Sequence, residues 1–233
     1  MKFRVGIENN NDGVRTVAWA LQHPGCYAYG ENGEKALAAL PGAIRTYSQW
    51  IGQHEPSWLK AENVELEVEG VWDSYYIDKN FDRASGENDN YIVESWFQHD
   101  WKPLTAEDVE HALKLLAWSR ADLLKLVGPL PAEKLDQTYP GEKWSINGIL
   151  KHMGGSEWWY MDRIGKAFPK RQIPKTPMER LEKVRAAFVK LLPRLEGLKT
   201  VTGAEGEFWS PRKVVRVAIW HERDHTVHIR KLI

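Results

Sequence analysis

Residues 219–229 read Ile-Trp-His-Glu-Arg-Asp-His-Thr-Val-His-Ile, and the spacing of their histidines decides how the second half of the chain is expected to fold. On an α-helix, positions four apart lie about 40° apart around the axis, so His221 and His225 project from one face. Counting back in steps of three and four continues this face through Val214 and Ala218. The pattern predicts an amphipathic helix whose inward face carries histidines.

A third histidine lies on a separate predicted helix, in the stretch Ile149-Leu-Lys-His-Met. This residue, His152, falls on or beside the core-facing stripe of its helix, which runs through Ile149. Burying imidazoles without partners is costly, whereas one shared divalent ion satisfies a nitrogen of each. His152, His221 and His225 are therefore the predicted ligands, and three histidines leave coordination positions open for water or substrate.

Four further side chains near these histidines have two interpretations each. His228 is either a second-shell group or substrate contact, or a hydrogen-bonded core histidine. Trp158, Trp159 and Trp220 flank the ligands in sequence, and they either wall an apolar pocket or belong to the core. Glu222 points away from the histidine face, so it is not expected to be a general base.

Composition excludes several classes of protein. The chain has 233 residues, 27% of them charged and 42% hydrophobic, as in ordinary globular proteins. The single cysteine, Cys26, excludes an intramolecular disulfide and a cysteine-type zinc site. No apolar run is long enough to span a membrane, so a cytoplasmic location without a membrane partner is expected. The basic run at 166–175 is too short to indicate nucleic-acid binding.

Charge is unevenly distributed along the chain. Residues 1–102 hold 9 Lys and Arg against 16 Asp and Glu, and residues 103–233 hold 23 against 16. Opposite formal charges can steer two domains together, or two subunits in a homodimer. The equally weighted alternative is that each half has a solvated surface of one sign.

The first half, residues 1–102, has the pattern of a small α+β domain with additional strands. Residues 3–7 and 15–21 are predicted strands joined by a turn at 9–13. A helix is predicted from Glu34 to about Gly52, and further strands at 64–69 and 91–96.

The second half, residues 103–233, is predicted to be all-helical. Helix starts are signalled at Thr105, Ser145, Thr176 and Ser210, with a proline directly after each of the last two. Such a pattern predicts a four-helix bundle, in which metal sites form between facing helices. Gly154-Gly155 inside the second helix either allows close helix approach or a bulge, or has no role.

Part of the first half resembles the HicB antitoxin-like domain over about residues 1–70. The matching features are the turn Pro24-Gly25-Cys26, the strand end Ala28-Tyr29-Gly30 and the helix start Glu34-Lys35-Ala36-Leu37. No DNA-binding tail follows, so the resemblance implies a structural or partner-facing module and no nucleic-acid partner.

Residues 104–233 resemble the DinB-like superfamily, in particular the branch with bacillithiol transferases and putative metal hydrolases. The matches are Trp144-Ser-Ile-Asn-Gly-Ile-Leu-Lys-His152, Glu157-Trp158-Trp159, and the stretch 220–229. The resemblance implies a four-helix bundle in which His152, His221 and His225 bind a divalent ion, zinc or nickel in related proteins.

Two functions from different classes follow. The first is a metal-dependent enzyme, a thiol S-transferase or a hydrolase, whose partners are a low-molecular-weight thiol and an electrophilic substrate. The second is a non-catalytic adaptor or stress-related binding protein, with a structural or vestigial metal site and a partner-binding HicB-like domain. A fourth protein ligand would indicate a structural site, and an open position a catalytic one.

Overall fold

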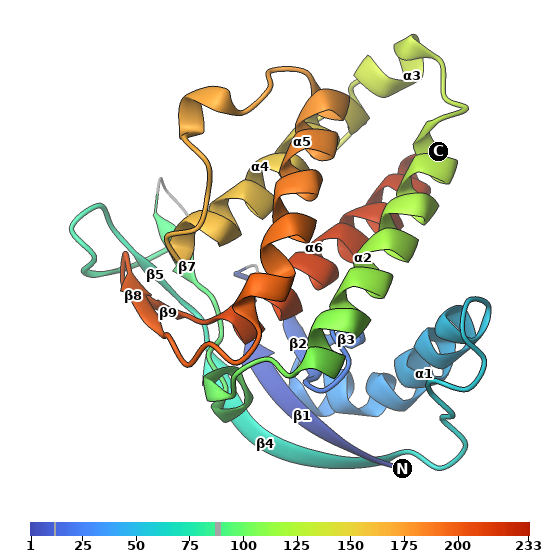
Figure 1. Cartoon of the computed structure of the whole chain (residues 1–233), viewed down its shortest axis with the longest axis vertical. Coiled ribbons are helices and arrows are strands. Elements are labelled where there is room, and N and C mark those ends of the chain that lie inside the picture. The colour runs from blue at the N-terminus through green and yellow to red at the C-terminus, as the bar shows by residue number, and fades with distance from the viewer. Residues whose placement is uncertain (12, 87–89) are drawn as a thin grey trace. The chain divides into compact units, whose positions relative to one another are not determined.

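The computed structural model describes residues 1–11, 13–86 and 90–233, which form two compact units. The N-terminal unit comprises Met1–Lys102 and Gly203–Phe208, and the helical unit comprises Pro103–Thr202 and Trp209–Ile233. An α+β fold is confirmed, with sheets and one long helix in the N-terminal region and a mostly helical region after it (Figure 1).

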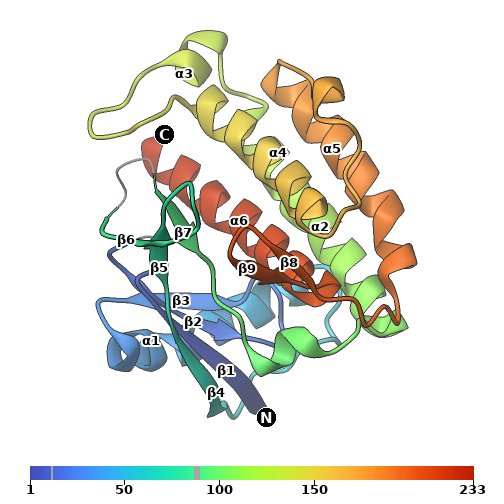
Figure 2. The ribbon, with the colours of Figure 1, turned by 90° about the vertical axis from the view of Figure 1, so that its left-hand side faces the viewer.

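The main sheet of the N-terminal unit has the strand order β3-β2-β1-β4. Strands β1, β2 and β3 pair antiparallel, and β4 pairs parallel with β1. The parallel pair requires a crossover, which helix α1 provides between β3 and β4 (Figure 2). The elements span β1 Lys2–Asn9, β2 Thr16–Ala20, β3 Tyr27–Gly30, α1 Gly33–Gly52 and β4 Glu65–Asp73. The turn predicted at 9–13 includes Asp12, which lies outside the described residues.

Helix α1 begins and packs as its sequence predicts. The Asn32 side chain accepts a hydrogen bond from the Lys35 amide at 2.9 Å and so caps the first turn. The buried stripe of the helix then recurs at three- and four-residue steps, which is the spacing of one helix face. Its members are Ala36, Leu40, Ile44, Tyr47 and Ile51.

A buried carboxylate ties the sheet to the chain that follows it. Glu8 is 1% exposed and accepts hydrogen bonds from the Trp19 indole at 3.0 Å, the Ser74 hydroxyl at 2.8 Å and the Ser95 amide at 3.1 Å. Because both oxygens are bonded, this buried acid has a structural role.

A second, small sheet has the order β6-β5-β7. Its strands are β5 Tyr75–Ile77, β6 Arg83–Ala84 and β7 Tyr91–Val93, followed by a short 3-10 helix at Gln98–Trp101. The strand predicted at 91–96 is therefore shorter than expected, and β5 and β6 are too short to show an alternating pattern.

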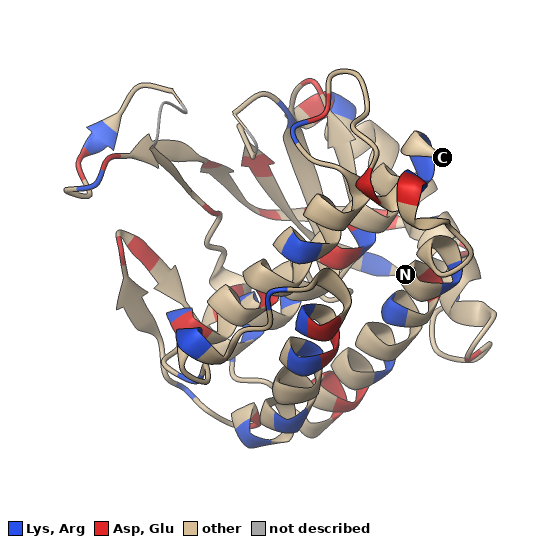
Figure 3. Ribbon diagram, turned by 90° about the horizontal axis from the view of Figure 1, so that it is seen from above, with Lys and Arg blue, Asp and Glu red and all other residues tan. Residues whose placement is uncertain are grey.

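Four long helices form the helical unit, within the part of the chain that the structure describes: α2 Ala106–Val127, α4 Ile146–Arg163, α5 Pro177–Leu191 and α6 Pro211–Leu232. Helix α6 packs against α2 and α4, and α4 packs against α5 (Figures 1 and 2). Both signs of charge occur along the helices (Figure 3). Shorter elements are α3 Ala132–Asp136 and 3-10 helices at Lys170–Gln172 and Leu192–Leu195.

The predicted helix starts are correct, with one difference in how they are capped. Thr105, Ser145 and Ser210 each accept a hydrogen bond from a backbone amide of the first turn. Thr176 does not cap the backbone of α5. Its hydroxyl donates instead to the Glu179 carboxylate at 2.5 Å, so the signal predicted the position of the start but not its hydrogen bond.

The prediction that residues 103–233 are all-helical is wrong at one place. A β-hairpin of β8 (Thr202–Ala204) and β9 (Glu207–Trp209) interrupts the helices, and residues 203–208 belong to the N-terminal unit. Its two-residue turn has positive φ at both Glu205 (49°) and Gly206 (80°), the geometry of a tight hairpin turn. Strands of three residues are too short to stand out in the sequence.

Gly154 allows two helices to approach closely. A Cβ atom at this position would lie 2.8 Å from Arg180 Cγ and 3.2 Å from the backbone nitrogen of Leu181, both on α5. At Gly155 the nearest atom would be 3.6 Å away, an ordinary contact. Of the interpretations given above, close helix approach is therefore correct for Gly154.

Among the described residues, no helix has the length and apolar character that crossing a membrane requires.

Candidate metal centre

The three predicted ligands meet in the helical unit. His152 Nε2 lies 3.0 Å from His221 Nε2, and His225 Nε2 lies 3.1 Å from His221 Nε2. The ligand atoms of all three lie within 4.8 Å of one another, and the side chains are partly buried. Helix α6 supplies two of them from adjacent turns, and α4, packed against it, supplies the third.

The arrangement fits a metal ion. Nitrogens bound at about 2.0–2.1 Å to one tetrahedral zinc ion are separated by about 3.3 Å, close to the 3.0 and 3.1 Å found for two of the three pairs. Among the described residues, no fourth histidine, cysteine or carboxylate joins the cluster. Three protein ligands leave a coordination position for an exogenous molecule.

The environment keeps the imidazoles neutral, which is the form that binds metals. Burial and the neighbours His225 and His152 hold the pKa of His221 well below its ordinary value. Burial, with His152 and His228, lowers the pKa of His225 to about 3. Burial, with the charge of Lys143, lowers the pKa of His152.

His228 is not part of this convergence. Its Nε2 lies 2.9 Å from Glu142 Oε2, and its ring centroid is 6.1 Å from that of His225. Glu142 belongs to the segment between α3 and α4. The structure thus places His228 beside the cluster, with a carboxylate partner of its own.

The predicted tryptophans have different surroundings. Trp158 is 8% exposed and its indole donates to the Phe168 carbonyl at 2.8 Å, which indicates a packing role. Trp159 contacts the Trp209 ring edge-on at 5.2 Å between centroids. Trp220 contacts a candidate ligand, edge-on to His221 with 6.0 Å between ring centroids.

Two aromatic neighbours of the histidines were not predicted. The Trp144 ring stacks on His152 with 4.7 Å between centroids, and Tyr160 meets His221 edge-on at 5.9 Å. A weak signal for Trp144 was available, because it directly precedes Ser145, the predicted N-cap of the helix that carries His152.

A cluster of four charges also lies in the bundle, and we call it the charge quartet: Arg120, Glu157, Arg185 and Glu222. The four side chains are between 4% and 11% exposed. Arg185 donates to both carboxylates, at 2.7 Å to Glu157 and 2.9 Å to Glu222, and Arg120 donates to Glu222 at 2.7 Å. Each of α2, α4, α5 and α6 contributes one member.

The opposite charges of the quartet compensate one another. Burial alone would raise the pKa of Glu222, but Arg185 and Arg120 outweigh it and hold that pKa below its ordinary value. Burial would likewise lower the pKa of Arg185, and the two carboxylates instead raise it. Glu222 is therefore a paired anion, which agrees with its exclusion as a general base.

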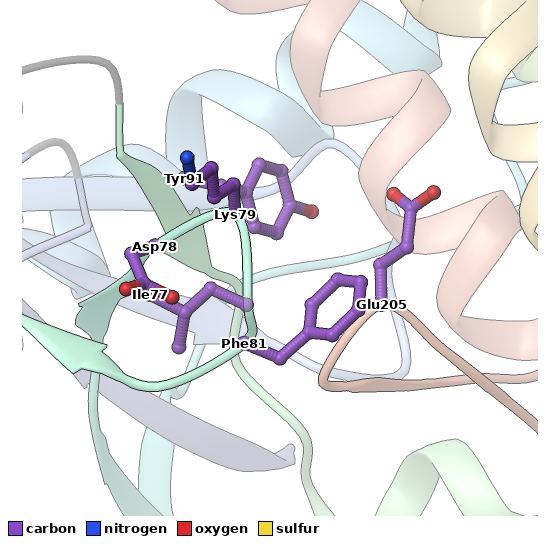
Figure 4. A pocket seen from close by; sticks show the side chains of 6 residues that line it. All are labelled: Ile77, Asp78, Lys79, Phe81, Tyr91 and Glu205. Atoms are coloured by element: carbon purple, nitrogen blue, oxygen red, sulfur yellow. The ribbon is translucent and has the colours of Figure 1, made fainter.

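The N-terminal unit contains a cavity of about 300 Å³ that holds no histidine (Figure 4). It is lined by Ile77, Asp78, Lys79, Phe81, Tyr91 and Glu205. Asp78 is committed to its own loop, since its carboxylate accepts from the amides of Asn80 and Asp82. The lining therefore offers no ligand set like that of the helical unit.

Fold and cluster together define a helical-bundle domain with a candidate three-histidine metal site. Residues 115–229 match the model of the DinB superfamily, so the chain contains a DinB superfamily domain over this range. No family match covers the N-terminal unit, and its HicB-like character stays a prediction. No curated protein and no solved structure matches the chain.

Proposed function

We propose that this protein is a divalent-metal-dependent enzyme that transfers a low-molecular-weight thiol to an electrophile or hydrolyses a small substrate. The observation that supports the proposal is the convergence of His152, His221 and His225 without a fourth protein ligand among the described residues. A divalent ion such as zinc or nickel would lower the pKa of a bound thiol or water and make it a nucleophile near neutral pH.

The protein's own residues would bind the ion and position the exogenous group. Three neutral imidazoles leave the full positive charge of the ion uncompensated, which favours an anionic form of the exogenous group. Trp220 and Tyr160 lie edge-on to His221 and wall its surroundings with apolar surface. No described residue of the cluster is a protein nucleophile, so the attacking atom comes from the cosubstrate.

The first test is metal binding. Wild-type protein freed of metal should bind about one zinc or nickel ion in calorimetric titration. His225→Asn should weaken the affinity by at least about 100-fold. Loss of a hydrogen-bond partner of a metal ligand costs about 10- to 100-fold in affinity, and loss of the ligand itself costs more. His111→Asn is the matched control, since His111 lies on α2 beside Glu107 and outside the cluster.

The second test separates the enzyme from the adaptor. Metal-loaded protein should consume a model electrophile in the presence of a thiol, or hydrolyse a small ester or amide, and His225→Asn should not. Metal binding without turnover in either assay would favour the non-catalytic adaptor, and absence of metal binding would remove the basis of both assays.

Within this proposal the N-terminal unit is a HicB-like, partner-facing module without catalytic residues. The support is its strand–turn–strand–helix order, with a turn at Gly25 (φ 81°) and an amide-to-carbonyl bond from Cys26 to His23 at 2.9 Å. Val71→Ser, which alters an exposed position of β4, should therefore leave metal affinity and turnover unchanged.

A further inference from the structure

The segment at residues 137–144, which we call the site loop, is held against both helices that carry the candidate ligands. Trp144 stacks on His152 of α4 with ring centroids 4.7 Å apart and an interplanar angle of 30°. Glu142 Oε2 lies 2.9 Å from Nε2 of His228 on α6. The two contacts fix the end of the loop beside the histidine cluster.

Because Gly148 has no side chain, it leaves room for Trp144 to lie against α4. A Cβ atom on Gly148 would lie 2.8 Å from Cβ and 3.3 Å from Cγ of Trp144, so a larger residue would push the indole off α4. Trp144 nevertheless remains 38% exposed. The indole therefore contacts a candidate ligand while part of its surface stays open to a solute.

Lys143, the residue before Trp144, carries a positive charge close to the Trp144 ring. Lys143 Nζ lies 5.3 Å from the centroid of the Trp144 ring. That ring in turn stacks on His152 with 4.7 Å between centroids, so Trp144 links the ammonium group to the histidine cluster. Lys143 is exposed, and no ion pair to a carboxylate is found for it in the described part of the chain. The neighbouring carboxylate, Glu142, is already occupied by His228.

We propose that Lys143 is a specificity-determining residue of the histidine site and selects a substrate that carries a carboxylate. This inference rests on the proposed function, because the substrate is the molecule that fills the open coordination position. Stacking of Trp144 on His152 keeps the ammonium group near the histidine cluster. An exposed ion pair contributes about 0.2–1 kcal/mol, equivalent to a preference of about 1.4- to 5-fold.

The test compares two thiols of similar length on the cobalt(II)-loaded full chain, 3-mercaptopropionate and the neutral 2-mercaptoethanol. Thiolates are good ligands for such ions, and thiolate binding to cobalt is followed by its charge-transfer absorption. Wild-type protein should bind the carboxylated thiol about 1.4- to 5-fold more tightly. Lys143→Gln should remove this preference, and Lys143→Glu should reverse it.

Lys151→Gln is the matched control, because it removes an exposed lysine that is next to His152 in sequence but lies outside the site loop. It should keep the wild-type preference. Equal binding of the two thiols to wild-type protein, a preference that survives Lys143→Glu, or cobalt binding without any thiol band would each overturn the inference while leaving the metal site standing. Absence of cobalt binding would overturn the proposed function as well. Circular dichroism of each variant verifies that it is folded.

Discussion

The histidine cluster and the charge quartet are two polar groups in one helical unit, and they differ in how they are satisfied. Helix α6 contributes to both through adjacent residues, His221 and Glu222, which project about 100° apart around its axis. In the quartet every carboxylate faces a guanidinium, at 2.7–3.5 Å. In the histidine cluster, ring nitrogens face ring nitrogens, at 3.0 and 3.1 Å.

From this difference we infer a structural role for the charge quartet and a functional role for the histidine cluster. Buried charges are tolerated when opposite charges and hydrogen bonds compensate them, and the quartet has both. Three converging neutral imidazoles can satisfy one another only in part by hydrogen bonding, and a shared cation would satisfy a lone pair of each. We therefore expect the quartet to control stability and the histidines to control metal binding, and each prediction below tests that division.

The largest effect is expected from Arg185→Met. The substitution leaves Glu157 and Glu222 buried with only Arg120 between them, and breaking a buried pair costs about 3–5 kcal/mol. Urea unfolding should show a loss of this size. Arg194→Met, an exposed arginine after α5, should change the free energy of unfolding by less than about 0.5 kcal/mol. A loss below about 1 kcal/mol for Arg185→Met would contradict a structural role for the quartet.

The next effect is a dependence of metal-free stability on pH. The folded-state pKa of His221, His225 and His152 lies below the ordinary value of 6.5, and that of His225 is about 3. The unfolded chain therefore takes up protons first as the pH falls. Stability should decrease from about pH 6.5 downward, by about 1.4 kcal/mol per pH unit for each histidine that stays neutral.

The control for this pH dependence replaces all three histidines with asparagine. Its free energy of unfolding should fall less than that of wild-type protein between pH 6.5 and 5.5, a range above that in which carboxylates titrate. An unchanged slope in the triple variant would assign the effect to other groups. Saturating zinc should raise the stability without flattening the wild-type profile, because bound imidazoles stay unprotonated in the folded state while those of the unfolded chain still take up protons.

Local signals in the sequence were sufficient for the four long helices and for the three histidines that cluster. Helix starts were correct because N-caps and first-turn prolines act within four residues. The histidines were identified because two of them are one turn apart and the third follows the stripe of its own helix. The hairpin at 202–209 was missed because pairing between three-residue strands leaves no period to detect.

The charge quartet was missed for a different reason. Its four members come from four helices, and no local pattern joins residues so far apart in the chain. A weaker signal exists at Arg185, which lies four residues after Leu181 and three before Phe188, both fully buried. A cation on such a stripe implies a buried acidic partner but does not say which one.

A smaller effect is expected from Gly154→Ala. The new methyl group would lie 2.8 Å from Arg180 Cγ and 3.2 Å from the Leu181 backbone, so α5 must shift, at a cost of about 1–3 kcal/mol. Because α5 carries Arg185 but none of the three candidate ligands, stability should fall while metal affinity is kept. Gly155→Ala is the matched control and should be neutral or stabilising by up to about 1 kcal/mol. If Gly154→Ala costs more free energy of metal binding than free energy of unfolding, then the histidine cluster and the charge quartet are coupled through α4.

The smallest effect is expected from His228→Asn, which tests where the histidine site ends. His228 lies three residues after His225 on α6, and yet its Nε2 contacts Glu142 and not the other three rings. The lost interaction is a partly exposed ion pair at most, so the free energy of unfolding should change by about 1 kcal/mol or less. Zinc affinity should change by less than about 10-fold, the lower limit for losing a partner of a metal ligand. Calorimetric titration beside His225→Asn makes the comparison direct, since both variants lose one imidazole from the same helix face. If His228→Asn loses zinc as completely as His225→Asn, then His228 is a ligand and the site is rearranged when it binds metal.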